Sequence, residues 1–255
     1  MFSRQDLIYS LERQYIIPYF QPVHDSASGR CIGAEVLARL YHPEYGIVPP
    51  ADFLAYLQDM DGLAALTQTL MIKVGHWLGE NPVSDGFILT FNIPPNMAGQ
   101  TWLLCASQAL RSLSAHRVVV VLELTEQLPL TDISARFQRR LRRLRYAGVK
   151  IALDDFGTGY AGFSLMQQVA GDMLKIPREF VSQAMTCYIT ASIIDNIISL
   201  TRHLGMKVIA EGVESKEQVD LLAKKGIVLM QGFYFSPPLN AADFETYMTM
   251  EKLCD

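Results

Sequence analysis

The chain has 255 residues, of which 50% are hydrophobic, so it can bury a large core, and this length suits either two small domains or one α/β barrel. Its formal net charge of -4 argues against a protein that coats nucleic acid or an anionic membrane by bulk electrostatics, and we expect no nucleic acid polymer as a partner. The 4 cysteines lie far apart without zinc or redox spacing, so we interpret them as reduced thiols and expect a cytoplasmic protein.

The N-terminal segment and the longest uncharged segment both argue against membrane insertion. The start, MFSRQDLIYSLERQ, carries charges where a signal peptide needs its apolar stretch. The uncharged run between Asp85 and Arg111 contains Asn92, Pro94 and Pro95, which interrupt it as a spanning helix. We therefore expect neither export nor a transmembrane segment.

Short apolar runs rich in β-branched residues alternate along the chain with longer segments of helical period. Eight runs predict strands at 18–25, 31–40, 87–94, 118–126, 149–157, 172–177, 207–215 and 229–235. Between the first two runs stands only SASGR, which is too short for a crossover helix. These two strands are therefore expected to pair as an antiparallel hairpin.

The segment 131–148, TDISARFQRRLRRLRYAG, is the clearest helix candidate. Thr131 is a possible N-cap, and Gly148 is a stop signal. Its apolar face is made of Ile133, Phe137, Leu141 and Leu144. The arginines between these positions are interpreted as a solvated polar face rather than as a nucleic acid site.

Alternation of strands and helices predicts an α/β protein with a mostly parallel sheet. Eight such units without a long polar linker favour a closed barrel over an open sheet. We expect a modified (β/α)8 TIM-like barrel with an antiparallel first strand, formed as a single domain by residues 1–255.

Seven of the predicted strands end in a polar side chain of the same parity as the apolar residues before it. In VVVVLELTE, for example, Val119 and Val121 precede Glu123. In such a barrel, alternate residues face the interior, and the carboxyl ends of the strands form the active-site rim. The side chains expected there are Glu35, Asn92, Glu123, Asp154, Lys175, Glu211 and Gln231.

The chemistry of this rim predicts a site for hard cations. Its members are carboxylates and amides, joined by the adjacent Asp155, and no histidine or cysteine stands at ligand spacing. Mg²⁺ or Mn²⁺ suits such oxygen ligands better than zinc does. Two buried neighbouring acids, Asp154 and Asp155, would repel each other unless cations intervene, and a pair of cations is a known device for cleaving a phosphodiester.

At these residues the chain resembles the EAL domains, which are bacterial phosphodiesterases of cyclic di-GMP. The resemblance runs in order along nearly the whole chain, through FQPVHD, GAEVLARL, FNI, ELTE, IALDDFGTGY, DMLKI, VIAEGVES and MQGFYFSPPL. It implies a barrel that hydrolyses cyclic di-GMP to linear pGpG with two divalent cations, Mg²⁺ or Mn²⁺. It also implies a homodimer.

The resemblance assigns roles to individual residues. It implies that the metal ligands are Glu35, Asn92, Glu123, Asp154, Asp155 and Glu211. Lys175 corresponds to the lysine that orients or deprotonates the attacking water, and Gln231 to a residue near that water.

Further residues match positions that surround the reaction. Arg39 matches the family's phosphate-binding arginine, and Gln21 and Pro237 match substrate contacts. Glu126 would anchor the DFGTGY loop, and Glu214 matches a supporting acid of the AEGVE motif.

The chain departs from the family pattern in three places. Val36 replaces the signature alanine on the strand face opposite Glu35, where we expect only a packing adjustment. Ala161 and Gly162 stand where the family often has two serines. Pro177 stands in KIP where the family has KID, and proline cannot supply that carboxylate.

Two other functions stay open at this point. A receptor could hold cyclic di-GMP without turnover and act through a protein partner, although the retention of Lys175 and every ligand argues against it. Barrel enzymes that abstract a proton beside a carboxylate also use acids on a metal and a lysine base. Enough ligands for two metals, together with Arg39, make that second alternative less favoured than phosphodiester hydrolysis.

Overall fold

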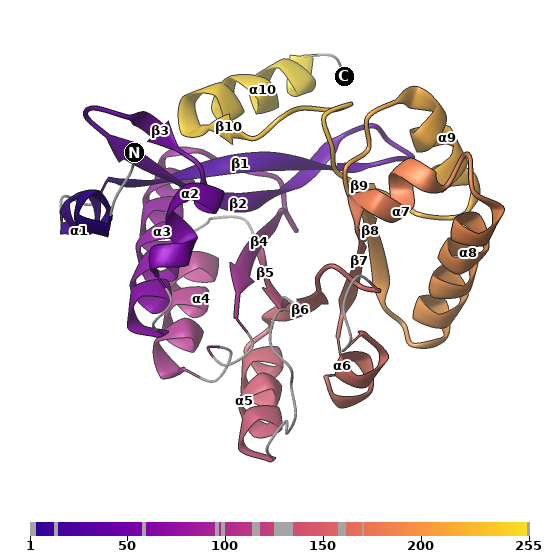
Figure 1. Ribbon diagram of the computed structural model, residues 1–255, viewed down its shortest axis with the longest axis horizontal. Helices are drawn as coiled ribbons and strands as arrows, with labels where there is room; N and C mark the ends of the chain where they lie inside the picture. Colours follow the sequence, from indigo (N-terminus) through magenta and orange to yellow (C-terminus); the bar gives the residue numbers. More distant parts are fainter. Residues whose placement is uncertain are drawn as a thin grey trace.

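The computed structural model describes residues 4–12, 15–57, 60–94, 97, 100–113, 118–124, 135–157, 162–169 and 171–253. Within them, eight strands form a closed ring in the order β1-β2-β4-β5-β6-β7-β8-β9, with β9 paired to β1 (Figure 1). The strands of the ring are β1 Ile16–Asp25, β2 Cys31–His42, β4 Ile88–Ile93, β5 Val119–Leu124, β6 Lys150–Leu153, β7 Met173–Ile176, β8 Lys207–Ala210 and β9 Leu229–Met230. The predicted barrel is confirmed.

The first strand runs against both of its neighbours in the ring. β1 pairs with β2 and with β9 in antiparallel register, whereas the other neighbouring pairs of the ring are parallel. In the connection to β2, Asp25 Oδ1 accepts hydrogen bonds from the backbone N–H groups of Ala27 and Ser28, and Gly29 takes a φ of 73°. This tight polar turn explains why the predicted hairpin forms.

Two short strands lie outside the sequence prediction. β3 Gly46–Val48 pairs with β2, and β10 Leu239–Asn240 pairs with β1. Strands of two or three residues are too short to show a hydrophobic period. Several predicted runs were also too long, because the polar motif residues at the ends of 149–157 and 207–215 belong to loops after β6 and β8.

Helices cover the outside of the ring (Figure 1). They are α1 Arg4–Glu12, α2 Pro50–Phe53, the 3-10 helix Leu54–Tyr56, α3 Met60–Glu80, α4 Thr101–Leu113, α5 Ala135–Tyr146, α6 Gly162–Gln168, α7 Arg178–Gln183, α8 Tyr188–His203, α9 Lys216–Lys224 and α10 Ala241–Leu253. Of the described helices, none combines the length and the apolar character that a membrane crossing needs.

Helix α5 follows the sequence prediction where it is described. Leu141 and Leu144 are buried, Phe137 packs at the edge of the core, and Gly148 takes a φ of 81° after the helix ends. The predicted N-cap Thr131 and the apolar Ile133 lie outside the described residues.

The core has two parts, separated by the ring of strands. The larger part lies between the strands and the surrounding helices. The smaller part fills the interior of the barrel and consists of Val23, Ile88, Val121, Ala152, Met173, Ile209 and Leu229. Since these are the inward-facing positions that strand parity predicts, the next inward-facing residue on each strand is placed at the carboxyl rim.

Candidate active site

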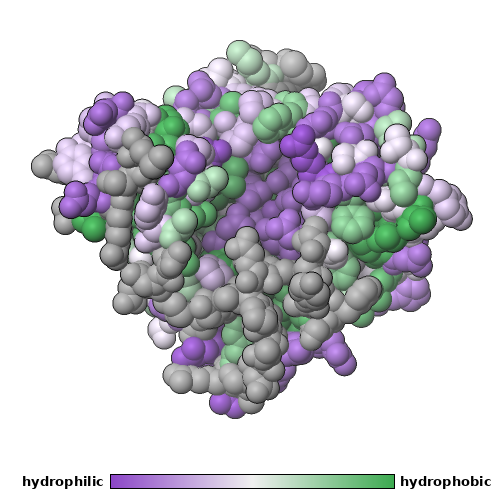
Figure 2. All heavy atoms as spheres, in the orientation of Figure 1, coloured by the Kyte–Doolittle hydropathy of each residue, from purple (hydrophilic) through white to green (hydrophobic). Residues whose placement is uncertain are grey.

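Polar side chains lie at the rim of the barrel, and five of them come two residues after an interior apolar residue of a strand. Glu123 follows the interior Val121 by two residues, and Lys175 follows Met173 in the same way. The same spacing relates Asp154 to Ala152, Glu211 to Ile209, and Gln231 to Leu229. In Figure 2 hydrophilic surface lines a hollow in the middle of the face, over the strand ends of Figure 1.

Lys175 lies at the centre of this polar group. Its side chain is buried, and its Nζ is 2.9 Å from Glu123 Oε2 and 2.5 Å from Glu211 Oε1. The same nitrogen is 3.3 Å from Glu35 Oε2 and 3.2 Å from Asp154 Oδ1. One ammonium group therefore bridges four carboxylates that come from four different strands or their ends.

Two amides hold Glu35 in position. Asn92 Nδ2 donates to Glu35 Oε1 at 2.7 Å, and Gln231 Nε2 donates to Glu35 Oε2 at 2.7 Å. Gln231 also reaches Glu211 Oε1 at 3.4 Å. The amide of Asn92 keeps its carbonyl oxygen as a possible ligand for a cation.

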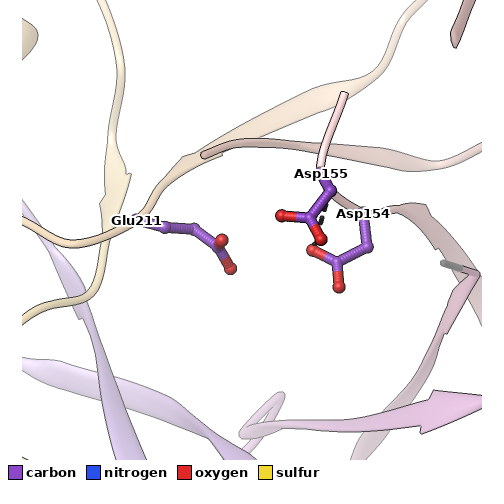
Figure 3. Close-up of side chains that lie close together, drawn as sticks. All are labelled: Asp154, Asp155 and Glu211. Atoms are coloured by element: carbon purple, nitrogen blue, oxygen red, sulfur yellow. Dashed lines mark hydrogen bonds between the residues drawn. The ribbon is translucent and has the colours of Figure 1, made fainter. Parts of the chain in front are cut away.

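The backbone explains how two adjacent acids can face one site. Successive residues of a strand point to opposite faces, but β6 ends at Leu153, and Asp155 has a φ of 52°. Aspartate is one of the few residues that enter this left-handed region at low cost. The turn brings both carboxylates to the same side, where Asp155 N donates to Asp154 Oδ1 at 3.0 Å (Figure 3).

Glu211 faces this pair from the loop after β8 (Figure 3). One oxygen from each of Asp154, Asp155 and Glu211 lies within 4.8 Å of the others. The sequence predicted that these residues would meet, and the structure brings them together.

Burial and repulsion between the carboxylates perturb the acids of the rim. Burial and then the neighbouring carboxylates raise the pKa of Glu123 well above its ordinary value, although Lys175 opposes this effect. Burial likewise raises the pKa of Glu211 to about 8. The pKa of Asp155 is also raised, first by burial and then by the charge of Asp154.

Two rim groups keep their charges instead. Burial opposes ionisation of Glu35, but the Lys175 ammonium and two amides hold the pKa of Glu35 below its ordinary value. Burial also disfavours the charge of Lys175, yet the surrounding carboxylates outweigh it and hold the pKa of Lys175 well above its ordinary value. In this arrangement of charges Lys175 is an ammonium and a hydrogen-bond donor.

The residues fit a site for divalent cations. The ligand set consists of carboxylate and amide oxygens, which Mg²⁺ and Mn²⁺ prefer. Glu123 Oε1 is buried and has no hydrogen-bond partner within the described part of the chain. A buried carboxylate oxygen without a partner is costly, and a cation would satisfy it.

Of the remaining predicted substrate contacts, only one is among the described residues that line the cavity containing Lys175. Gln21 lines the cavity of about 300 Å³ that contains Lys175. Arg39 Nη1 donates a hydrogen bond to the Ala38 carbonyl oxygen at 2.8 Å, and its guanidinium carbon is 5.2 Å from the centre of the Tyr19 ring. Pro237 is exposed beyond β9. The structure therefore brings Gln21 to the site, but neither Arg39 nor Pro237 is among the described residues that line the cavity.

A second cavity of about 470 Å³ opens beside the acidic cluster. Asn92, Asp154 and Asp155 stand at its edge, and its walls are mostly apolar side chains from β2, β4, α2 and α3. This apolar space next to charged groups is suited to a flat, partly apolar ring.

Of the two acids predicted to support loops, the structure describes Glu214. Glu126 lies outside the described residues. Glu214 is exposed and pairs with Arg178, whose Nη2 is 2.6 Å from Glu214 Oε1. Sequence reasoning missed Arg178, because an arginine at the start of a helix gives no signal of facing a cavity.

Comparison with known proteins gives a consistent result. The family model described as EAL domain matches residues 4–238. The chain is 33% identical over 247 residues to cyclic di-GMP phosphodiesterase PdeL of Escherichia coli (strain K12), which covers 95% of this chain and 67% of PdeL. It is 34% identical over 231 residues to probable cyclic di-GMP phosphodiesterase PdeG of the same organism, over 89% of this chain and 45% of PdeG.

A solved structure gives the same fold. The EAL domain protein from Listeria monocytogenes EGD-e superposes with a TM-score of 0.81 at 26% identity, over 98% of both chains. By contrast, this chain spans two thirds of PdeL and less than half of PdeG.

Proposed function

This chain belongs to the EAL domain family, and from that premise we propose that it is a metal-dependent phosphodiesterase that hydrolyses cyclic di-GMP to linear pGpG. The observation that carries the proposal is the meeting of Asp154, Asp155 and Glu211 beside the buried Lys175 at the carboxyl rim of the barrel. Such a reaction lowers the level of a second messenger.

We propose two divalent cations, Mg²⁺ or Mn²⁺, as cofactors. Their ligands would be Glu35, Asn92, Glu123, Asp154, Asp155 and Glu211. Bound there, the cations would activate a water molecule and stabilise the charge that develops on the phosphoryl oxygens. The buried, unpartnered Glu123 Oε1 and the all-oxygen ligand set support this assignment.

The chain's own groups orient the reactants. Lys175 donates hydrogen bonds as an ammonium, so we assign it to orienting the attacking water rather than to removing its proton. Gln231 fixes Glu35 and Glu211 through its amide, which keeps both carboxylates aimed at the same space. Attack by the water oxygen on phosphorus forms the new P–O bond and breaks the bond to the ribose 3′ oxygen, and of the two protons of the water one ends on that oxygen, which leaves as a hydroxyl group, while the other is released to solvent.

Substrate contacts extend from this centre. Gln21 lines the cavity with Lys175, and the apolar cavity beside Asp155 offers space for a guanine ring. Arg39 and Pro237 stay assigned to the substrate by resemblance, and Arg39 would have to leave its contact with the Ala38 carbonyl. Glu126 and Glu214 stay assigned to support of the loops.

We also propose a homodimer as the working form. Apolar side chains at the α7 to α8 junction support it, since Met185, Tyr188, Ile189 and Ile193 are 53%, 85%, 69% and 39% exposed. Figure 2 shows hydrophobic surface on the right of the molecule, where Figure 1 places α7 and α8. The thiols of Cys105 and Cys187, which form no disulfide within the described part of the chain, support a cytoplasmic location, and the closed ring supports one domain over residues 1–255.

Product analysis with the purified protein tests the proposed function. We expect pGpG to form from cyclic di-GMP when Mg²⁺ or Mn²⁺ is present, and to stop forming when a chelator is in excess. Binding of cyclic di-GMP without pGpG would instead identify a receptor. Full turnover in the chelator would reject the metal-dependent mechanism.

A further inference from the structure

Two ion pairs join the ends of strands β7 and β8. These strands are parallel neighbours, with Ile176 beside Ala210. The inner pair, Lys175 with Glu211, is buried in the rim at 2.5 Å. The outer pair, Arg178 with Glu214, is 2.6 Å long, and its side chains are 63% and 46% exposed. The outer pair is therefore more exposed to solvent than the inner pair.

The backbone on both sides directs Arg178 into the cavity. Pro177, with φ fixed near -69°, precedes helix α7, so Arg178 is its first residue. The aliphatic stem of Arg178 lies directly over Gly212, where any Cβ would overlap it. Gly212 also has a φ of 61°, which favours glycine. Arg178 and Glu214 both line the cavity that contains Lys175.

Arg178 and Lys175 are the described cations that line the cavity, and they differ in how far their charge is already neutralised. The charge of Lys175 is shared by four carboxylates, whereas Arg178 contacts one carboxylate and is open to water. Arg39 is turned away to a backbone carbonyl and an aromatic ring. Arg178 thus offers donors to an anion in the cavity.

We propose that Arg178 binds the phosphate of the cyclic dinucleotide that is not being cleaved, and that Glu214 holds its guanidinium in position. This inference rests on the proposed function. The substrate has two phosphodiesters on opposite sides of its ring, and the metal-binding acids account for only one. A guanidinium presents five N–H donors in a planar fork, so it can keep Glu214 on one side and contact phosphate oxygens with the others.

The proposal predicts selectivity for a substrate with two phosphates. Bis(p-nitrophenyl) phosphate has a single phosphodiester and would meet only the acidic cluster. Removing the Arg178 charge should therefore weaken the binding of cyclic di-GMP and leave the hydrolysis of the small ester unchanged. A charge-assisted contact of this kind corresponds to a loss of about tenfold in affinity.

The experiment compares Arg178→Gln, Arg178→Lys and the control Arg142→Gln, which removes an exposed arginine from α5. Steady-state rates are measured on both substrates with Mn²⁺, and cyclic di-GMP binding is measured with Ca²⁺. For Arg178→Gln we expect KM and Kd for cyclic di-GMP to rise about tenfold, with kcat within about twofold. Arg178→Lys should lie between this variant and wild type, because it keeps the charge but not the fork. Arg142→Gln should match wild type.

Glu214→Gln tests the positioning role. It should raise KM for cyclic di-GMP severalfold, and its effect should not add to that of Arg178→Gln in the double variant. Additive effects would show that the two side chains act independently and would contradict the role of Glu214.

The outcomes separate this inference from the proposed function. If wild type neither binds nor cleaves cyclic di-GMP, the proposed function fails and the inference fails with it. If wild type cleaves it and Arg178→Gln behaves like Arg142→Gln, only the inference is overturned. An equal fall in kcat on both substrates would also overturn it, because Arg178 would then act on the acidic cluster rather than on the second phosphate.

Discussion

Lys175 determines the charge balance of the rim. Its ammonium is the one described cation that contacts the buried acids Glu35, Glu123, Asp154 and Glu211. Without it, these carboxylates would face one another at short range with no cation between them. Removing one partner of a buried ion pair typically costs about 3–5 kcal/mol.

Lys175→Ala should lower kcat about 100-fold, which is the scale for losing one preorganised hydrogen-bond donor in an active site. The metal-free variant should also melt at a lower temperature than wild type, and Mn²⁺ should recover part of the loss. Lys150→Ala is the matched control, because Lys150 pairs with Asp172 at 3.0 Å on the surface. Activity equal to that of the control would contradict the assigned role of Lys175.

As a proposed ligand, Glu211 should make metal binding depend on pH. Its pKa of about 8 in the metal-free protein means that it carries a proton at pH 6. A cation that uses this carboxylate must displace the proton, so apparent Mn²⁺ affinity should fall about tenfold for each pH unit below 8. Calorimetry at pH 6 and pH 8 measures the change.

Glu211→Gln is the control for that titration. It should bind Mn²⁺ more weakly at pH 8, and it should lose the part of the pH dependence that Glu211 contributes, while Glu123 and Asp155, whose pKa values are also raised, keep their own part. If wild type binds Mn²⁺ with equal affinity at the two pH values, the cation does not displace a proton from Glu211.

At the scale of elements, the start of helix α7 differs from the family pattern. Pro177 caps α7 with an extended backbone, φ -69° and ψ 157°, and has no group that can bind a metal or move a proton. Its effect should therefore be confined to backbone geometry.

Pro177→Asp tests that interpretation. An aspartate tolerates an extended N-cap conformation and can cap the helix, so activity should stay within a few fold of wild type or rise. Initial rates of pGpG formation measure this. If wild type binds cyclic di-GMP without turnover and Pro177→Asp turns it over, the chain is a receptor disabled at one position.

Helix α8 carries the surface that we assign to dimer formation. Tyr188 and Ile189 stand in its first turn and are 85% and 69% exposed, while Ile194 and Ile197 on the other face are buried. A charge at an apolar interface must be desolvated without a partner, which is unfavourable.

Ile189→Asp should shift the protein from dimer to monomer, as measured by light scattering during size-exclusion chromatography. Asn196→Asp adds the same charge further along α8 and should leave the dimer intact, because Asn196 is an exposed polar residue. A dimer that survives Ile189→Asp would place the interface elsewhere.

At the scale of the whole molecule, the barrel holds the proposed ligands from several strands on one closed ring. Strands β2, β4 and β5 supply Glu35, Asn92 and Glu123, and the loops after β6 and β8 supply the other acids. Such a frame limits how far the oxygens can adjust to the size of an ion.

Ca²⁺ should therefore occupy the site and inhibit turnover in the presence of Mn²⁺. It takes more ligands at longer bonds, about 2.3–2.6 Å against 2.0–2.1 Å for Mg²⁺, and holds them in a looser geometry. Rates measured across a Ca²⁺ titration, with binding of cyclic di-GMP followed in parallel, test this. Turnover in Ca²⁺ alone at the rate seen with Mn²⁺ would contradict it.

The order of residues was enough to predict the ring and most of the rim. Strand residues alternate strictly between two faces, so the parity that placed Val121 inside also placed Glu123 above it. The same argument placed Asp154, Lys175 and Glu211, and the short SASGR segment fixed the antiparallel start. These inferences needed only local geometry, which the order of residues contains.

The orientation and the partners of side chains outside the strand period could be seen only in the folded chain. Asp154 and Asp155 reach the same side because β6 ends at Leu153 and Asp155 takes a left-handed φ. The pairing of Arg178 with Glu214 depends on where α7 begins and on the space above Gly212. The contact of Arg39 with the Ala38 carbonyl depends on a rotamer. Loop dihedrals, helix starts and long side chains follow no repeating period, because contacts between distant segments fix them.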